Sequence, residues 1–273
     1  MKAAAFEYLK PQDVPGAIKA LAGSAGDAKA LGGGQSLGPM LNLRLTRPKL
    51  LVDVSCLEAM RTIADKGDVW RIGGAVTHSA IEDAKLTGCT VVSDVARGIA
   101  YRTIRNRGTI GGSLAHADPS ADWPLALPAL AATIFISGPA GERSVPAAEF
   151  MKGAFATVLM DDELVVAVEV PKLSAGARWG YWKFCRKTGE FPEASAAMLM
   201  DPGRKLARLW VGALNGAPQP LASLAAEIAM KGSLAATETA VSAALERSVP
   251  EPDPIQRRLQ ITAVRRAVEK GFM

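Results

Sequence analysis

Two glycine-rich segments constrain the fold of this chain more than any other feature. The first, GGGQSLG, covers residues 32–38, and the second, TIGGSLAHAD, covers residues 109–118. Glycine lets the backbone adopt a positive φ and lets amide groups approach a ligand closely, so a loop such as 32–36 can direct several N–H donors at phosphate oxygens. For one such loop alone, the alternative is a tight turn between a strand and a helix that binds no ligand.

A Rossmann dinucleotide-binding motif is the first interpretation to test for the first segment. The segment follows a predicted strand, and Asp53 stands about 20 residues farther on, where a ribose-binding acid belongs. The spacing nevertheless fails, because Leu37 occupies the position of the third glycine and Pro39 follows closely. We therefore expect Asp53 to be a residue at the end of a strand.

The second segment changes the interpretation of the first. It adds hydroxyl donors at Thr109 and Ser113, two more glycines, and the acids Asp118 and Asp122, ahead of a predicted helix. Two loops at element junctions of one α+β region suit a pyrophosphate that is held from both sides. A carboxylate is then left to accept hydrogen bonds from ribityl or ribose hydroxyls.

The pattern up to residue 172 alternates helices and strands. A helix over 13–23 begins at the capping residue Asp13, Thr77 caps another, and 120–132 reads as a buried helix that Pro128 must kink or end. The expected strands are 49–55, 68–74, 163–170 and the hairpin formed by 133–138 and 143–145.

A domain boundary is expected near 168–178, after Pro171. Beyond it, strands over 179–187, 193–201 and 205–214 predict an antiparallel sheet, and helices over 221–232, 236–248 and 254–271 close the chain. In the last helix, the apolar residues expected toward one side are Ile255, Leu259, Ile261, Val264 and Val268.

Composition excludes several classes of protein. The 273 residues are 49% hydrophobic and 22% charged, which is a globular composition with a sizeable core. The net charge of +5 arises from 32 basic and 27 acidic residues mixed along the chain, so it does not indicate a nucleic-acid partner. We find no membrane-spanning stretch and no signal-peptide segment, and we expect a cytoplasmic protein without membrane insertion.

Cysteines and histidines are too few and too scattered for a metal centre. Cys56, Cys89 and Cys185 form no CxxC pair, which argues against zinc, against an iron–sulfur cluster bound by this chain alone and against a disulfide framework. The only histidines are His78 and His116. For His116 we favour a hydrogen bond to the loop backbone over a redox role.

The segments GGGQSL and TIGGSLAHADPSAD, with GAVTH between them, closely resemble the FAD-binding medium subunit of the molybdenum hydroxylases. That family includes carbon monoxide dehydrogenase and the flavin domain of xanthine dehydrogenase. The resemblance continues through FEYLKPQDVPGAIKAL, NLRLTRPKLLVDVS, WKFCRKTGEF and RRLQITAVRRAV, so it covers nearly the whole chain.

The resemblance implies the fold and the domain limits. It implies an α+β, two-part FAD-binding domain of the PCMH or vanillyl-alcohol-oxidase type over residues 1–172, with subdomains of about 1–56 and 57–172. A C-terminal domain with a three-stranded antiparallel sheet and a helical bundle follows over 173–273.

The resemblance also implies which residues bind FAD. The first pyrophosphate segment is Leu31, Gly32, Gly33, Gly34, Gln35, Ser36 and Leu37, and the second is Thr109, Ile110, Gly111, Gly112 and Ser113. Asp122 matches the acid that holds the sugar-like chain of the flavin. His78 and Ile99 fall near the flavin in similar proteins, and Leu159 and Lys187 match residues that approach the isoalloxazine.

One segment departs from the family pattern. In RKTGEFPEASAAM, Glu190 replaces an aspartate of the family, and Pro192 precedes the next strand. The alternative for Lys187 is a solvated surface cation. Arg102, Arg105 and Arg107 could attract phosphate, but no aromatic residues interleave with them, so we expect them to support a loop or to face a partner.

The implied function is that of an electron-transfer subunit without catalytic side chains of its own. A molybdenum-binding large subunit with molybdopterin would oxidise the substrate, and a small subunit would pass electrons from its [2Fe-2S] clusters to FAD in this chain. A dimer of such heterotrimers is expected. The alternatives are a self-contained FAD-dependent oxidase or dehydrogenase and a non-enzymatic interaction subunit that has lost FAD.

Overall fold

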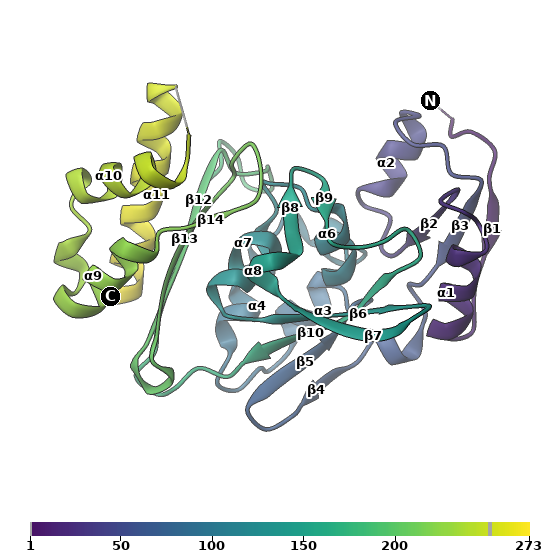
Figure 1. Ribbon diagram of the computed structural model, residues 1–273, viewed down its shortest axis with the longest axis horizontal. Coiled ribbons are helices and arrows are strands. Elements are labelled where there is room, and N and C mark those ends of the chain that lie inside the picture. Colours follow the sequence, from purple (N-terminus) through teal and green to yellow (C-terminus); the bar gives the residue numbers. More distant parts are fainter. Residues whose placement is uncertain (1, 251–252) are drawn as a thin grey trace.

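The computed structural model describes residues 2–250 and 253–273. Three main sheets follow one another along the long axis of the molecule in the order of the sequence (Figure 1). A three-stranded sheet lies at the N-terminal end, a five-stranded sheet with helices on one face lies in the middle, and a four-stranded sheet with three helices lies at the C-terminal end. The architecture is the mixed α+β fold that the sequence predicts.

The N-terminal sheet is parallel, with strand order β1-β3-β2. Its elements are β1 (Glu7–Leu9), α1 (Val14–Ala22), β2 (Ala28–Leu31), α2 (Leu37–Asn42) and β3 (Leu50–Asp53). Asp13 caps α1 as predicted, since its Oδ1 accepts the Gly16 N–H at 2.7 Å. Because Leu31 pairs with Asp53, the segments that follow β2 and β3 leave the sheet at the same edge. Asp53 does end its strand, as expected.

The middle sheet is antiparallel throughout, with strand order β4-β5-β10-β6-β7. Its strands are β4 (Ile63–Asp65), β5 (Val69–Gly73), β6 (Thr133–Gly138), β7 (Gly141–Pro146) and β10 (Leu164–Pro171), preceded by the 3₁₀ helix η1 (Glu58–Met60). The predicted hairpin is β6-β7. A small ribbon, β8 (Met151–Gly153) with β9 (Ala156–Thr157), leads into β10.

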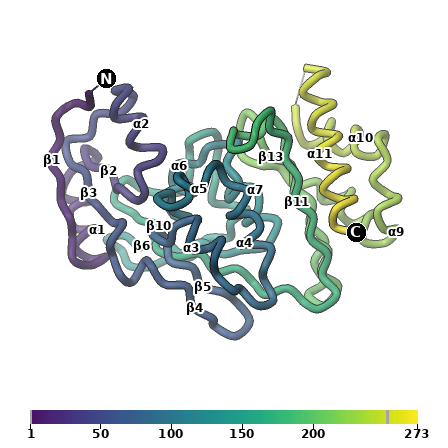
Figure 2. Tube along the Cα trace, turned by 180° about the vertical axis from the view of Figure 1, so that it is seen from behind, coloured from purple at the N-terminus to yellow at the C-terminus, as the bar shows by residue number. Residues whose placement is uncertain are grey.

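Six helices accompany the middle sheet, and the longer ones cover one of its faces (Figures 1 and 2). They are α3 (His78–Asp83), α4 (Thr90–Arg97), α5 (Arg102–Arg105), α6 (Ile110–His116), α7 (Asp122–Ala129) and α8 (Ala147–Phe150). Every residue of α7 is buried, which indicates a helix packed on all sides. Pro128 lies in its last turn, and the helix ends one residue later.

The C-terminal sheet is antiparallel, with strand order β11-β12-β13-β14. Its strands are β11 (Arg178–Phe184), β12 (Ala194–Asp201), β13 (Leu206–Gly212) and β14 (Gln219–Pro220), with the 3₁₀ helix η2 (Pro202–Arg204) between β12 and β13. The three predicted strands are confirmed, and β14 adds a short fourth. On one face, Ala197 and Trp210 pack against Leu125 and Ala129 of α7. This contact explains why α7 has no exposed side.

Three helices cover the other face of the C-terminal sheet: α9 (Ala222–Lys231), α10 (Glu238–Ser248) and α11 (Pro254–Phe272), with the 3₁₀ helix η3 (Ser233–Ala235). In α11, Val264 and Val268 are fully buried as predicted, but Ile255 is 72% exposed. Ile255 lies nine positions before Val264, and at about 100° per residue this places it on the opposite side of the helix. Its assignment to the apolar side was wrong.

We propose that residues 1–172 and 173–273 are separate domains, and that the first divides at about residue 56. Each of the three ranges contains one main sheet. Within the described part of the chain, no helix has the length and apolarity needed to cross a membrane.

Candidate cofactor-binding site

The first glycine segment connects the end of β2 at Leu31 to the start of α2 at Leu37. Gly34 adopts a φ of 72°, in the left-handed region that favours glycine. The backbone N–H groups of residues 33–37 donate no hydrogen bond to any residue that the structure describes. Five consecutive free amides between a strand and a helix can bind an anion.

The two glycine segments touch each other. A Cβ on Gly33 would lie 1.8 Å from the backbone oxygen of Arg107, and a Cβ on Gly32 would lie 2.9 Å from Thr109 Oγ1. Neither position accepts a larger residue without displacement of its neighbour. The absence of side chains at Gly32 and Gly33 therefore brings the free amides against the start of the second segment.

The second segment is mostly helical, because α6 begins at Ile110, directly after Thr109. The interpretation of this segment as a second glycine loop was therefore wrong. Thr109 caps α6, and its Oγ1 accepts the Gly112 N–H at 3.1 Å. The amides of Ile110 and Gly111 donate to the carbonyls of Val76 and Gly74 at 3.1 and 2.9 Å, and that of Ser113 donates to Thr109 O.

These bonds change what the second segment can offer a ligand. Its first four helical amides are already used, so its available donors are the hydroxyls of Thr109 and Ser113. Thr109 Oγ1 can still donate its proton, and the Ser113 hydroxyl has no hydrogen-bond partner within residues 2–250 and 253–273. Gly111 is required by packing, since a Cβ there would lie 2.6 Å from Gly74 O.

Asp122 is the first residue of α7, and its carboxylate is 7% exposed. Oδ1 accepts two hydrogen bonds from β11, one from Tyr181 Oη at 2.6 Å and one from Lys183 Nζ at 2.7 Å. Burial, and then the charge of Asp122, raise the pKa of Tyr181 well above its usual value, so Tyr181 remains a hydroxyl donor. Oδ2 receives no hydrogen bond in the described part of the chain.

Ile99 lies in a turn between α4 and α5 and packs partly against the middle core. The Arg105 guanidinium holds this turn, with NH1 donating to Ile99 O at 2.9 Å and to Ala100 O at 3.1 Å. Ala100 has a φ of 42°, which is unfavourable for a residue with a side chain, so the turn needs such support. On the other side of the turn, Lys183 Nζ donates to Gly98 O at 2.8 Å.

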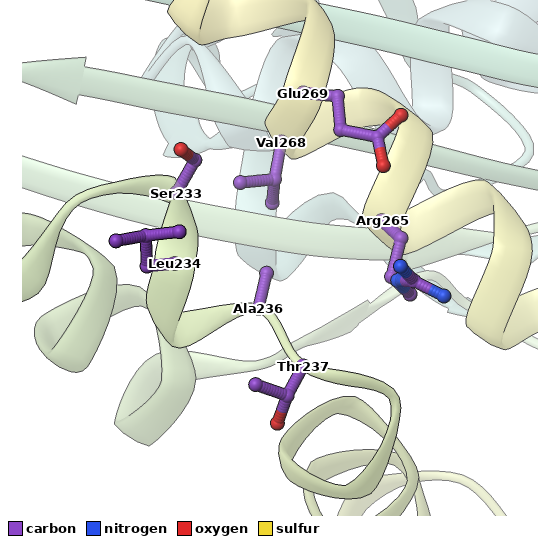
Figure 3. A pocket seen from close by; sticks show the side chains of 7 residues that line it. All are labelled: Ser233, Leu234, Ala236, Thr237, Arg265, Val268 and Glu269. Carbon is purple, nitrogen blue, oxygen red and sulfur yellow. The ribbon is translucent and has the colours of Figure 1, made fainter.

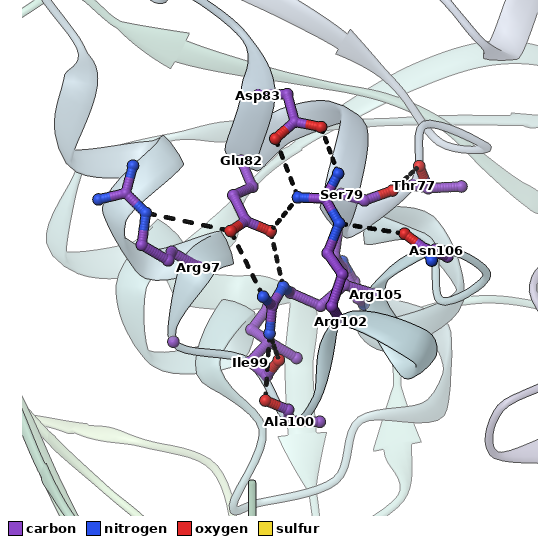
Figure 4. Close-up of polar contacts among 12 residues, drawn as sticks. Thr77, Ser79, Glu82, Asp83, Arg97, Ile99, Ala100, Arg102, Arg105 and Asn106 are labelled. Carbon is purple, nitrogen blue, oxygen red and sulfur yellow. Dashed lines mark hydrogen bonds and ion pairs between the residues drawn. The ribbon is translucent and has the colours of Figure 1, made fainter. Parts of the chain in front are cut away.

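Glu82 neutralises the arginines around this turn (Figure 4). Its carboxylate accepts Arg105 Nε at 2.7 Å and Arg102 NH1 at 2.8 Å, while Asp83 also binds Arg102. The hydrogen bonds and charges of Arg105 lower the pKa of Glu82, against the opposing effect of burial. The expectation of a loop-supporting role is confirmed for Arg105, whereas the Arg102 guanidinium binds, among the described residues, only the side chains of Glu82, Asp83 and Asn106. Arg107 is exposed, and its contribution is the backbone carbonyl beside Gly33.

His78 lies at the start of α3 and is buried. Its Nδ1 accepts the Trp123 Nε1 proton at 3.2 Å, and its Nε2 lies 3.0 Å from where a Cβ on Gly108 would be. Burial, and then the nearby Arg105 charge, lower the pKa of His78 to about 4, so the ring is neutral. His78 therefore joins α3, α7 and the start of the second segment.

Two predicted residues, Leu159 and Lys187, come from elsewhere in the chain. Leu159 packs partly against the middle core after β9. The Lys187 side chain is 79% exposed and pairs with Glu190 at 3.9 Å, in a loop whose Gly189 packs against the Tyr101 ring. Their contact with FAD stays a prediction. The ring of His116 packs against Phe155, with 5.2 Å between the ring centroids.

The residues present fit FAD. A diphosphate needs converging N–H and O–H donors, which the amides of 33–37 and the hydroxyls of Thr109 and Ser113 provide. A polyol chain needs a buried acceptor, and Asp122 Oδ2 is one. The predicted residues Gly32, Gly33, Thr109 and His78 are joined by direct packing, because Gly33 meets Arg107 and Gly108, and Gly108 meets His78.

Sequence reasoning missed Tyr181 and Lys183. The signal that could have identified them is the alternation in strand 179–183, which puts Trp179, Tyr181 and Lys183 on one face of β11. Trp179 and Tyr181 stack with an interplanar angle of 6°.

Two hollows in the surface lie apart from these residues. One, of about 300 Å³, lies among η3, α10 and α11 and is lined by Ser233, Leu234, Ala236, Thr237, Arg265, Val268 and Glu269 (Figure 3). The other, of about 220 Å³, lies beside α1 and the middle sheet, with Val14, Met60 and Arg71 in its wall. Neither is lined by a residue predicted to bind FAD.

Residues 4–173 match a known protein family, the FAD binding domain in molybdopterin dehydrogenase. Two curated relatives match over most of their lengths. The 6-hydroxypseudooxynicotine dehydrogenase complex subunit alpha of Paenarthrobacter nicotinovorans is 34% identical over 285 residues, covering 100% of this chain and 96% of that protein. The carbon monoxide dehydrogenase medium chain of Hydrogenophaga pseudoflava is 33% identical, covering 92% and 88%.

Solved structures have the same fold over nearly the whole chain. A chain of quinoline 2-oxidoreductase from Pseudomonas putida 86 superposes with a TM-score of 0.90 at 32% identity, covering 99% of this chain and 98% of that one. A chain of the Cu,Mo-CO dehydrogenase gives a TM-score of 0.91 at 28% identity, with 99% of each chain covered.

Proposed function

The chain belongs to the family of FAD-binding domains in molybdopterin dehydrogenases, and from this premise we propose that it is the electron-transfer subunit of a heteromeric molybdenum hydroxylase. It would take electrons from the [2Fe-2S] clusters of a partner subunit and pass them to an external acceptor. The observation that carries this proposal is the row of five free amides at 33–37, packed against the hydroxyl-bearing start of α6.

Each group of residues has a role in this proposal. The backbone of 32–37, with Thr109 and Ser113, would hold the diphosphate of FAD, and Asp122 would accept hydrogen bonds from its polyol chain. The residues proposed to lie near the flavin ring are His78, Ile99, Leu159 and Lys187. When bound, FAD supplies a ring system that exchanges one or two electrons, while the protein supplies position and electrostatics.

The relatives support placing substrate oxidation on another chain. Chains about one third identical to this one are named as subunits of a caffeine dehydrogenase, a nicotine 6-hydroxylase and a glyceraldehyde dehydrogenase. These names cover chemically unlike substrates, although each of these subunits is similar to this chain over about 70% of its length. We propose a molybdenum-binding large subunit with molybdopterin and a [2Fe-2S] small subunit as partners, assembled as a dimer of heterotrimers.

The test is to titrate the purified full-length chain with FAD, to add candidate substrates anaerobically and to follow flavin absorbance. We expect FAD to bind, no bleaching with organic substrates, and bleaching once both partner subunits are added. Riboflavin, which has no diphosphate, is the matched control ligand and should bind much more weakly.

Two results would contradict the proposal. Rapid bleaching of the isolated chain by an organic substrate would favour a self-contained oxidase or dehydrogenase. Failure of FAD to bind both to the isolated chain and to the assembled complex would favour a subunit that has lost its cofactor.

A further inference from the structure

The carboxylate of Asp122 lies where α7 meets the C-terminal sheet, and β11 holds it there. Resting on the proposed FAD function, we propose that Tyr181 and Lys183 are positioning residues, through which the C-terminal sheet orients Asp122 and the Ile99 turn and thereby sets the affinity for FAD. Neither side chain needs to touch FAD for this effect.

The two oxygens of the Asp122 carboxylate have different roles. Tyr181 Oη and Lys183 Nζ both donate to Oδ1, at 2.6 and 2.7 Å, and Oδ2 is left for another donor. Asp122 is 7% exposed and the Lys183 side chain 18%, so the ion pair is shielded from water. A hydrogen bond between charged groups is stronger where water is excluded, so the Lys183 ammonium holds the Asp122 carboxylate in one orientation.

The ammonium group of Lys183 also holds the turn that contains Ile99, a second residue predicted to lie near the flavin. Nζ also donates to Gly98 O at 2.8 Å, one residue before Ile99. Because Arg105 binds the carbonyls of Ile99 and Ala100, the turn is held from two elements at once. Loss of Lys183 would therefore release both Asp122 and one side of this turn.

The two donors are carried by a strand with little freedom to move. Gly180 lies between Trp179 and Tyr181, and a Cβ on Gly180 would be 1.8 Å from Ala267 O of α11. Although β11 is an edge strand, Lys183 and Tyr181 pair with Ser195 and Ala197 of the neighbouring strand β12. Groups on a packed strand position a site more accurately than groups on a loop.

The experiment compares the FAD dissociation constants of the full-length protein and three variants, measured by quenching of flavin fluorescence. Tyr181→Phe removes one oxygen atom, and Lys183→Met removes the charge but keeps most of the chain length. We expect each to weaken FAD binding about tenfold or more. Lys172→Met is the matched control, because it also breaks a lysine ion pair, with Asp65 at 2.7 Å, away from Asp122. It should bind FAD as the unchanged protein does.

A double-mutant cycle separates positioning from a general loss of stability. In the Asp122→Ala background, which has no acceptor left for Tyr181 to orient, Tyr181→Phe should have little further effect on FAD binding, even where both substitutions lower the melting temperature. Equal FAD affinity of the unchanged protein, Tyr181→Phe and Lys183→Met would overturn the inference while leaving the proposed function intact. Additive effects with Asp122→Ala would also overturn it. Absence of FAD binding by the unchanged protein, alone and in its complex, would instead contradict the proposed function.

Discussion

Gly33 packs against the backbone carbonyl of Arg107 so closely that a Cβ on Gly33 would lie 1.8 Å from the carbonyl oxygen. This contact joins two segments that lie more than 70 positions apart in the sequence. It places the free amides of 33–37 beside the N-terminus of α6.

Gly33→Ala should destabilise the protein and abolish FAD retention, because the methyl group can be accommodated only by moving the backbone. Overpacking of this kind costs about 1–3 kcal/mol or more of unfolding free energy, which urea denaturation can measure. Gly38→Ala is the control, since a Cβ on Gly38 meets no atom within 4 Å. Unchanged stability of Gly33→Ala would show that the two segments do not pack as described.

Gly112→Val should fold but lose FAD. Gly112 is exposed, and the one neighbour of its added Cβ would be Thr109 Oγ1 at 2.8 Å. Disturbing this helix cap costs about 1 kcal/mol, whereas the β-branched side chain would occupy the proposed diphosphate position. Gly176→Val, in open surroundings, is the control. A folded Gly112→Val protein with stoichiometric FAD would contradict the assignment.

His78 should make stability depend on pH in a defined window. Its pKa is about 4 in the folded protein against 6.5 when unperturbed, so the unfolded chain binds more protons between these values. Stability is therefore full above pH 6.5 and falls as the pH drops toward 4, by about 3 kcal/mol in all.

The matched variant is His78→Gln, which does not titrate and whose side-chain oxygen can still accept the Trp123 proton. The difference in unfolding free energy between the two proteins should change between pH 6.5 and pH 4 and stay constant above pH 7. Parallel pH profiles would show that the buried ring does not titrate in this way.

Arg105→Lys should loosen the Ile99 turn. Arg105 uses separate nitrogens, Nε for Glu82 and NH1 for the carbonyls of Ile99 and Ala100, and the single nitrogen of a lysine cannot reach both positions. We expect a loss of about 2–3 kcal/mol of unfolding free energy and faster proteolysis at the turn. Arg97→Lys, whose side chain is 62% exposed and 4.0 Å from Glu82, should have little effect. Equal losses in the two variants would count against a specific role for Arg105.

The sequence predicted those elements of the fold whose signals are local. The Asp13 and Thr77 caps were predicted correctly, because a cap involves residues only three positions apart. The three long strands of the C-terminal sheet were also predicted, since their lengths and turns follow from nearby residues. The start of α6 was missed, because Gly111 and Gly112 have low helix propensity and the helix is stabilised by bonds to Gly74 and Thr109.

The candidate site was predictable only in part, because some of its contacts join residues that lie far apart in the sequence. The glycine segments can be read as short motifs, but the tyrosine and lysine that bind Asp122 lie 59 and 61 positions away. No local pattern links residues at that distance. Likewise, nothing near Gly33 in the sequence indicates that Arg107 will face it.

The two glycine segments offer different kinds of hydrogen-bond donor, backbone amides at 33–37 and side-chain hydroxyls at Thr109 and Ser113. Substitutions in the two segments should therefore affect ligand binding in different ways. Every residue except proline supplies a main-chain N–H, so most substitutions in 33–37 would obstruct a ligand or leave its donors unchanged. At Thr109 and Ser113 the donors are side chains, and exchanges among serine, threonine, asparagine and alanine would adjust binding in small steps. Natural variation in cofactor affinity among related chains should therefore concentrate at the beginning of α6.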